Sequence, residues 1–188
     1  MEARHAVLLA IQAEDNGRIV GRTLLQKKLF FAARLIGPDI GFQPHYYGPY
    51  SQEVADATDS NVVNRFIEEQ VEVFEDSNVF GERRRHSYSI TSDGQEILDS
   101  ISSDPEIPQW QEAFNKINEQ PIASDFNLLS IAAKVLTILT DIKHGTADDI
   151  ISKAPGYGWK LTNAQVREVD DFLKNLGLTQ ERPAANSV

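Results

Sequence analysis

Apolar side chains recur with helical spacing along most of the chain, and this pattern predicts a mainly helical protein. Near the N-terminus, Val7, Leu8 and Ile11 form an i, i+3, i+4 stripe within a predicted helix over residues 3–14. Similar stripes predict further helices, over residues 23–36, 51–59, 62–67, 92–101, 108–121, 124–144, 146–154 and 162–176.

A different pattern follows the predicted helix over residues 62–67. Val71 and Val73, then His86, Tyr88 and Ile90, alternate with polar residues, which predicts a β-hairpin with strands at about 70–75 and 86–91. The intervening segment contains Val79 and Phe80 and suits an irregular hairpin tip that could contact a protein. Helices followed by such a hairpin and a capped helix are typical of a winged helix.

The predicted fold class is therefore mainly α with a small β-hairpin. We expect a winged helix-turn-helix domain over residues 1–101, followed by a C-terminal helical unit over residues 124–182. Residues 102–123 form a Ser/Asp/Pro linker and a connecting helix between them, and residues 183–188 form a flexible tail.

Short signals mark the ends of the second and third helices. Thr23 and Gln26 have the spacing of a capping box, and Gly37-Pro38 ends the helix that they begin. Ser51 is a suitable N-cap for the third helix. Leu25, Leu29 and Ile36 share one side of the second helix, which we expect to face the core.

The segment GRTLLQKKLFFAARL, followed by HYYGPYSQEV, resembles the Panacea-domain and YwgA-like proteins, a group of small prokaryotic proteins. The residues that carry the resemblance are Arg22, Leu25, Gln26, Lys27, Tyr47, Gly48, Pro49, Tyr50 and Ser51. The resemblance implies a winged-helix fold, and for some members an antitoxin role. Lys28 and Phe31 depart from the family pattern.

Composition narrows the function classes. The 188 residues include no cysteine, which excludes disulfides, thiolate catalysis and cysteine-based zinc sites. No run of 18 uncharged apolar residues is present, so we expect no membrane span and a cytoplasmic location. A net charge of −10 works against non-specific attraction to nucleic acid, since phosphate binding depends on Lys and Arg.

One candidate surface would bind a protein partner. Three tyrosines around the Gly-Pro turn could supply rigid contact area, and three acids on the third helix could attract a basic, toxin-like protein. These residues are Tyr46, Tyr47, Tyr50, Glu53, Asp56 and Asp59. The alternative interpretations are that the tyrosines hold the turn against the second helix and that the acids form a solvated face.

A second candidate surface would bind DNA. Cations on the second helix and the hairpin could contact phosphates, as the wing does in this fold class. These residues are Arg22, Lys27, Lys28, Arg83, Arg84 and Arg85. Acids at positions 53, 56 and 59 weaken this interpretation, because they would repel a duplex from the third helix.

Enzyme chemistry has little support in the sequence. The four histidines lack metal-ligand spacing, and no glycine loop or nucleophile elbow is present. We therefore expect no catalytic residues, no metal and no cofactor. The predicted function is a non-enzymatic recognition protein in a regulatory or toxin–antitoxin-like system, with a DNA-binding transcriptional regulator as the alternative.

Overall fold

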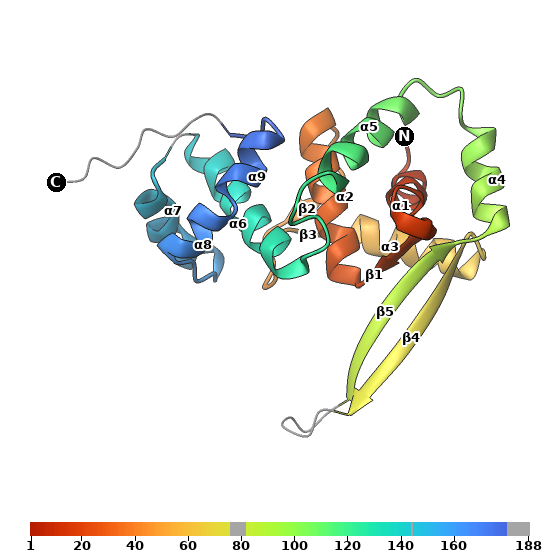
Figure 1. The fold of residues 1–188 in the computed structure, drawn as a ribbon, viewed down its shortest axis with the longest axis horizontal. Coiled ribbons are helices and arrows are strands. Elements are labelled where there is room, and N and C mark those ends of the chain that lie inside the picture. Colours follow the sequence, from red (N-terminus) through yellow and green to blue (C-terminus); the bar gives the residue numbers. More distant parts are fainter. Residues whose placement is uncertain (76–81, 144, 180–188) are drawn as a thin grey trace.

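Helix α2 (Arg22–Ile36) lies at the centre of the fold in the computed structural model, which describes residues 1–75, 82–143 and 145–179 (Figure 1). Three helices pack against it: α1 (Ala3–Gln12), α5 (Ile107–Asn118) and α6 (Phe126–Ile142). One hydrophobic core runs from α1 through α2 to the C-terminal helices. The protein is mainly helical with a small antiparallel sheet, which confirms the broad fold class.

Helix α2 is buried over most of its length. Leu25 and Leu29 lie in the core as expected, whereas Ile36 is only partly covered. The predicted capping box is wrong, because the helix begins after Gly21 without any side-chain cap and Gln26 bonds elsewhere. The predicted end is confirmed, since Gly37 adopts a left-handed conformation with φ of 99°.

The antiparallel sheet has three strands, in the order β1 (Arg18–Val20), β5 (Glu82–Ile90), β4 (Ile67–Glu75). The predicted hairpin is confirmed and is longer than expected. The short first strand pairs with β5 and places Ile19 beside Tyr88 in the core. The helix predicted over residues 62–67 is wrong, because Ile67 already begins β4.

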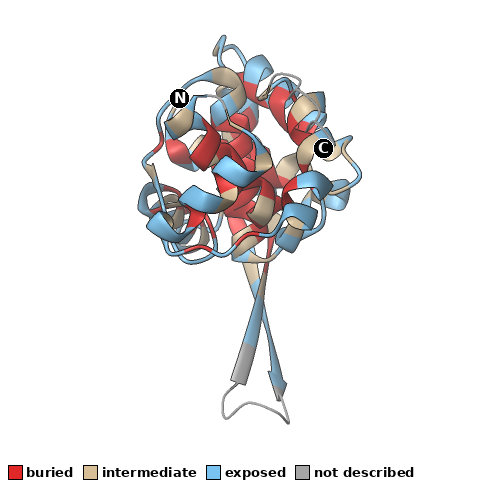
Figure 2. Ribbon diagram, turned by 90° about the vertical axis from the view of Figure 1, so that its left-hand side faces the viewer, coloured by how far each residue is buried: buried red, intermediate tan, exposed pale blue. Residues whose placement is uncertain are grey.

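The β4–β5 hairpin projects from the body of the molecule (Figure 1). Buried residues gather in the helical body, while the outer part of the hairpin is exposed (Figure 2). The expected protein contact at Val79 and Phe80 lies outside the described residues, as do residues 180–188 with the predicted tail.

Two very short strands, β2 (Phe42–Gln43) and β3 (Tyr50–Ser51), lie between α2 and α3 (Gln52–Val63). The N-cap is confirmed, since Ser51 Oγ accepts a hydrogen bond from the Val54 N–H at 3.1 Å. The helix runs one turn beyond its predicted end at Asp59, because Val62 and Val63 continue it.

The remaining helices follow the sequence pattern closely. Thr91 caps α4 (Ser92–Ser100), Thr146 caps α7 (Ala147–Lys153), and Thr162 forms a capping box with Gln165 at the start of α8 (Asn163–Glu168). The last predicted helix is wrong in one respect, because it breaks at Val169 and continues as α9 (Asp170–Asn175). Two 3₁₀ turns, η1 (Asp15–Gly17) and η2 (Ala154–Tyr157), complete the described chain. Within the described ranges, no helix combines the length and apolar character that crossing a membrane requires.

Candidate functional site

The tyrosine turn, residues 45–50, lies directly on α2 and α6. The Gly48 N–H donates to the His45 carbonyl at 2.9 Å, which closes the turn. Gly48 has a φ of 97°, and a Cβ at this position would lie 3.3 Å from the Ser130 carbonyl oxygen on α6. Both the backbone conformation and the close approach require glycine here.

Lys27 holds the turn from the interior of the protein through a hydrogen bond. Its Nζ donates to the Pro49 carbonyl at 2.6 Å, and the residue is only 2% exposed. Burial, with a smaller contribution from Lys134, lowers the pKa of Lys27 to about 8. Lys27 therefore belongs to the interior of the protein and not to a solvated basic face.

Gln26 fixes the other end of the turn. Its Nε2 donates to the Ser51 carbonyl at 2.9 Å, and its Oε1 accepts from the Ser51 N–H at 3.0 Å. The Ser51 hydroxyl in turn donates to the Ile40 carbonyl at 2.5 Å. The Gln-Lys pair of α2 thus bonds to the backbone of the Pro-Tyr-Ser segment, which gives the sequence motif a structural role.

Two tyrosines of the turn point into solvent. Tyr46 is 72% exposed and Tyr47 is 60% exposed, and their rings pack edge to face with centroids 4.8 Å apart. The turn is held by Gly48 and by the Pro49 backbone, so these two rings are not needed to hold it.

Tyr50 connects the turn to α3. Its ring lies 5.2 Å from that of His45, and its side chain lines a shallow pocket together with Thr58, Asp59 and Arg22. The acidic face of α3, formed by Glu53, Asp56 and Asp59, is exposed. These acids are spaced three residues apart and share one side of the helix. Of the predicted protein-partner residues, Tyr50 and Asp59 thus line one pocket, and Tyr46 packs on Tyr47.

A charged network joins α2 to the hairpin. Arg22 Nε donates to the Tyr88 hydroxyl at 2.7 Å, and its terminal nitrogen lies 3.1 Å from Glu69 Oε1. The Tyr88 hydroxyl and His86 Nδ1 lie 2.8 and 2.7 Å from the same Glu69 oxygen. The same terminal nitrogen of Arg22 lies 3.9 Å from Asp59 Oδ1.

The network favours the charged forms of Arg22 and Glu69. Burial opposes ionisation of Glu69, but hydrogen bonds from Tyr88, His86 and Arg22 outweigh it and lower the pKa of this carboxyl. Burial, with the bond to Glu69, raises the pKa of Tyr88. The positive charge of Arg22 is therefore balanced by nearby carboxylates, and its hydrogen bonds tie the hairpin to the helical body.

The predicted DNA-binding residues do not form one basic surface in the described chain. The expected basic side of α2 is wrong for Lys27 and for Lys28, because both ammonium groups are buried. Arg85 pairs with Glu72 across the hairpin and lies over the Phe74 ring at 5.0 Å. Arg84 is exposed on β5, and the side chain of Arg83 lies outside the described part of the structure.

A second buried polar cluster, which the sequence did not predict, surrounds Lys28 on α2. The Lys28 ammonium pairs with the Glu14 carboxylate and donates to Asn118 Oδ1 at 2.8 Å. Asn118 Nδ2 donates in turn to the Ala13 carbonyl at 2.7 Å, which ties α5 to the end of α1. Burial lowers the pKa of Lys28, and Glu14 opposes this shift. The sequence signal for this burial is that Lys28 lies between apolar residues, Leu24 and Leu25 before it and residues 29–31 (LFF) after it, in a helix that is apolar on several sides.

The chain is similar in sequence to an uncharacterised bacterial protein. The chain is 28% identical over 121 residues to "Uncharacterized protein YwgA" of Bacillus subtilis (strain 168), and the alignment covers 64% of this chain and 68% of that protein. No family model matches the sequence. The match agrees with the YwgA-like part of the resemblance and carries no information on activity. Among the described residues, no three histidine or carboxylate side chains are placed to hold a metal ion.

Proposed function

We propose that this chain is a non-enzymatic recognition protein that binds a protein partner through the tyrosine turn and the acidic face of α3. The observation that carries the proposal is the exposure of Tyr46 and Tyr47 on a turn whose backbone is bonded to buried side chains of α2. A turn held in this way presents its aromatic rings without a large ordering cost on binding.

The partner in this proposal is a basic protein. Glu53, Asp56 and Asp59 would increase its rate of association at low ionic strength, and the two tyrosines would supply the buried contact area. A basic toxin-like protein has this character, and an antitoxin role is what the Panacea-domain and YwgA-like resemblance implies for some members of that group.

The proposal includes a winged helix over residues 1–101. The order α1, β1, α2, α3, β4, β5 and the sheet order β1-β5-β4 support it. Residues 37–51 separate α2 from α3, whereas a helix-turn-helix has a turn of about three or four residues. We propose that this longer connection, which contains the tyrosine turn, is the binding element. In this proposal residues 102–123 are a connecting segment and residues 124–182 are a helical unit, and both support the connection.

DNA binding is the second candidate function. Exposure of Arg84 on the projecting hairpin favours it, because a wing of this kind can reach phosphates. The pairing of Arg22 with Glu69 and of Arg85 with Glu72 weakens it, since these cations are already neutralised. The acidic face of α3 would also lie where a recognition helix approaches the major groove.

Charge reversal on α3 tests the proposal. Glu53 occupies the second position of α3, and Asp56 follows three residues later; Asp93 and Glu96 occupy the matching positions of α4 and are likewise exposed. The variant Glu53→Lys/Asp56→Lys is compared with the matched control Asp93→Lys/Glu96→Lys. Each pair of substitutions changes the net charge equally. Each also places lysines near a helix N-terminus, which should destabilise the protein by a similar amount, about 0.3–1 kcal/mol.

The expected result is loss of a specific protein from affinity purifications with the α3 variant and its retention with the α4 control. Melting temperatures of the two variants should be similar. Retention of the same protein by both variants, or its loss from both, would count against the proposed surface.

A further inference from the structure

The outer edge of β4 presents unpaired backbone groups. β4 is at the end of the strand order β1-β5-β4, and its register with β5 continues without a bulge from Ile67 to Glu75. No other described segment pairs with this edge. Such an edge is able to pair with a further strand.

Two hydrogen bonds determine which groups face outward. The Thr91 N–H donates to the Phe66 carbonyl at 3.2 Å, so even-numbered residues of β4 direct their backbone groups toward β5. The Gly21 N–H donates to the His86 carbonyl at 2.8 Å, which agrees with this alternation. The N–H and C=O groups of Glu69, Val71 and Val73 therefore lie on the free edge.

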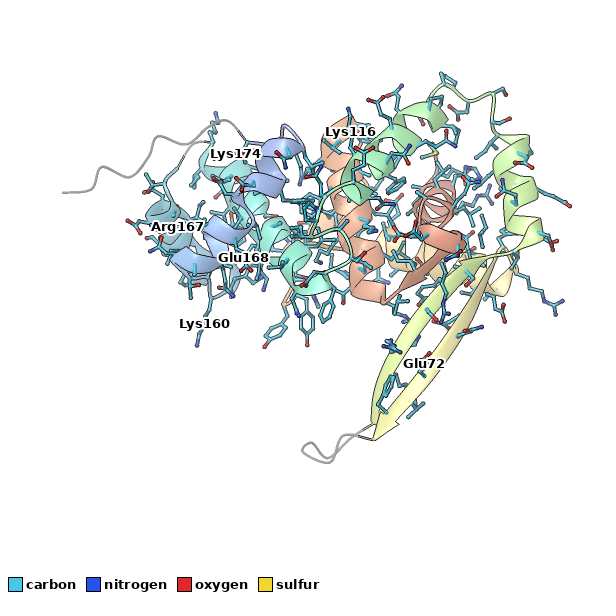
Figure 3. The ribbon with its side chains drawn as sticks, viewed as in Figure 1. Glu72, Lys116, Lys160, Arg167, Glu168 and Lys174 are labelled. Carbon is cyan, nitrogen blue, oxygen red and sulfur yellow. The ribbon has the colours of Figure 1, made fainter. Side chains whose placement is uncertain are left out.

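The side chains of β4 alternate between the two faces of the hairpin. Val71 and Val73 share the face of Glu69, and both are about half exposed. Glu72 and Phe74 lie on the other face, with Glu68 nearer the body, and Glu72 occupies the projecting part of the hairpin (Figure 3). β4 contains no Lys, Arg or Pro.

We propose that the free edge of β4 binds an extended basic segment of another protein as an additional strand. Residues of that segment opposite Val71 and Val73 would be apolar, and residues opposite Glu68 and Glu72 would be Lys or Arg. The preferred ligand is thus a strand in which apolar and basic side chains alternate. Backbone hydrogen bonds would supply affinity, and the alternation would supply specificity.

The same charges act against pairing of β4 with itself. Two copies joined through their β4 edges would bring two sets of carboxylates onto one sheet, which is unfavourable wherever a register places them opposite each other. Acidic residues therefore protect the edge from self-association while they favour a basic partner. β5, which pairs with β4 on the other side, already shows this preference, since Arg85 lies opposite Glu72.

This site is separate from the tyrosine turn and does not depend on the function proposed above. The Glu53→Lys/Asp56→Lys variant should retain the β4 edge unchanged, because neither residue contributes to the sheet. It therefore serves as the variant that distinguishes failure of the two proposals.

The probe is a fluorescently labelled ten-residue peptide in which lysine alternates with valine and threonine. A peptide of the same length with glutamate in place of lysine is the charge control. The full-length protein carries Val71→Pro/Val73→Pro, which removes two outward-facing N–H groups and leaves the bonds between β4 and β5 in place. The matched control is Val71→Thr/Val73→Thr, which keeps both N–H groups and the strand preference of the residues.

We expect the wild-type protein, the threonine control and the α3 variant to bind the lysine peptide in fluorescence anisotropy. The proline variant should bind it at least about tenfold more weakly, because two backbone hydrogen bonds are lost. A second variant, Glu68→Lys/Glu72→Lys, should reverse the preference and bind the glutamate peptide better than the lysine peptide.

Several results would overturn the proposal. The first is equal binding of the lysine and glutamate peptides by the wild-type protein, and the second is unchanged binding by the proline variant. The third is an unchanged preference in the lysine-substituted variant. Concentration-dependent dimers of the wild-type protein that the proline variant does not form would show that a second copy, and not a basic strand, occupies the edge.

Discussion

The side-chain amide of Gln26 pairs with the backbone of Ser51 through two hydrogen bonds, 2.9 and 3.0 Å long, in the interior of the protein. Gln26 lies in the second turn of α2, and Ser51 is the N-cap of α3. The pair therefore determines where the tyrosine turn ends and where α3 begins. Any binding surface built from the turn and α3 depends on it.

Gln26→Leu should destabilise the protein by about 1–3 kcal/mol, because it leaves the buried N–H of Ser51 without its partner. The measurement is the free energy of unfolding in urea. Gln95→Leu is the control, since the Gln95 amide bonds to the half-buried side chain of Gln12 and to the exposed side chain of Asp99, and both of these can reach water. Equal losses in the two variants would contradict the role assigned to Gln26.

Lys28 and Glu14 should behave as a coupled pair. Lys28→Met or Glu14→Gln alone should cost roughly 3–5 kcal/mol, because each leaves an uncompensated charge in the interior. The double variant should cost less than the sum of the two, with a coupling energy above about 1 kcal/mol. Additive losses in a double-mutant cycle would show that the contact contributes little.

Burial of Lys27 should make stability depend on pH in the alkaline range. The unfolded chain keeps the proton of this lysine up to its ordinary pKa of 10.5, whereas the folded protein releases it near 8. The unfolded state therefore binds more protons between these values, and the free energy of unfolding rises with pH. The rise should be smaller in Lys27→Met, and identical pH profiles from pH 8 to 10 would contradict the assignment.

Binding to generic duplex DNA should be weak and sensitive to salt, with a Kd no tighter than about 1 µM at physiological salt. The reasons are the net charge of −10 and the acidic face of α3. Gel shifts with random duplex test this prediction. Nanomolar retention would favour the regulator over the protein-binding function.

Local patterns were sufficient to predict most of the secondary structure. The N-cap at Ser51 and the stop at Gly37 depend on neighbouring residues, and both are present. The hairpin could be predicted because its alternation is local as well. The pairing of β1 with β5 could not, since three residues carry too little pattern to show what they pair with.

The candidate site was less predictable, because burial of polar residues depends on distant contacts. Thr23 and Gln26 have the spacing of a capping box, but the amide of Gln26 instead bonds to Ser51, which follows a long connection. Lys27 and Lys28 were expected on the surface by the usual behaviour of lysine. Their partners, Pro49 and the pair Glu14 and Asn118, come from other segments that only the fold brings near.

The most direct test of the proposed binding surface is photocrosslinking in cells that naturally produce the protein. A photoreactive phenylalanine derivative replaces Tyr47 on the tyrosine turn, and separate variants carry it at Arg84 on the hairpin and at Val63, which is 80% exposed at the end of α3. The account predicts an adduct with one specific protein from position 47 and none with that protein from position 63. Adducts with DNA from position 84, together with no protein adduct from position 47, would contradict it.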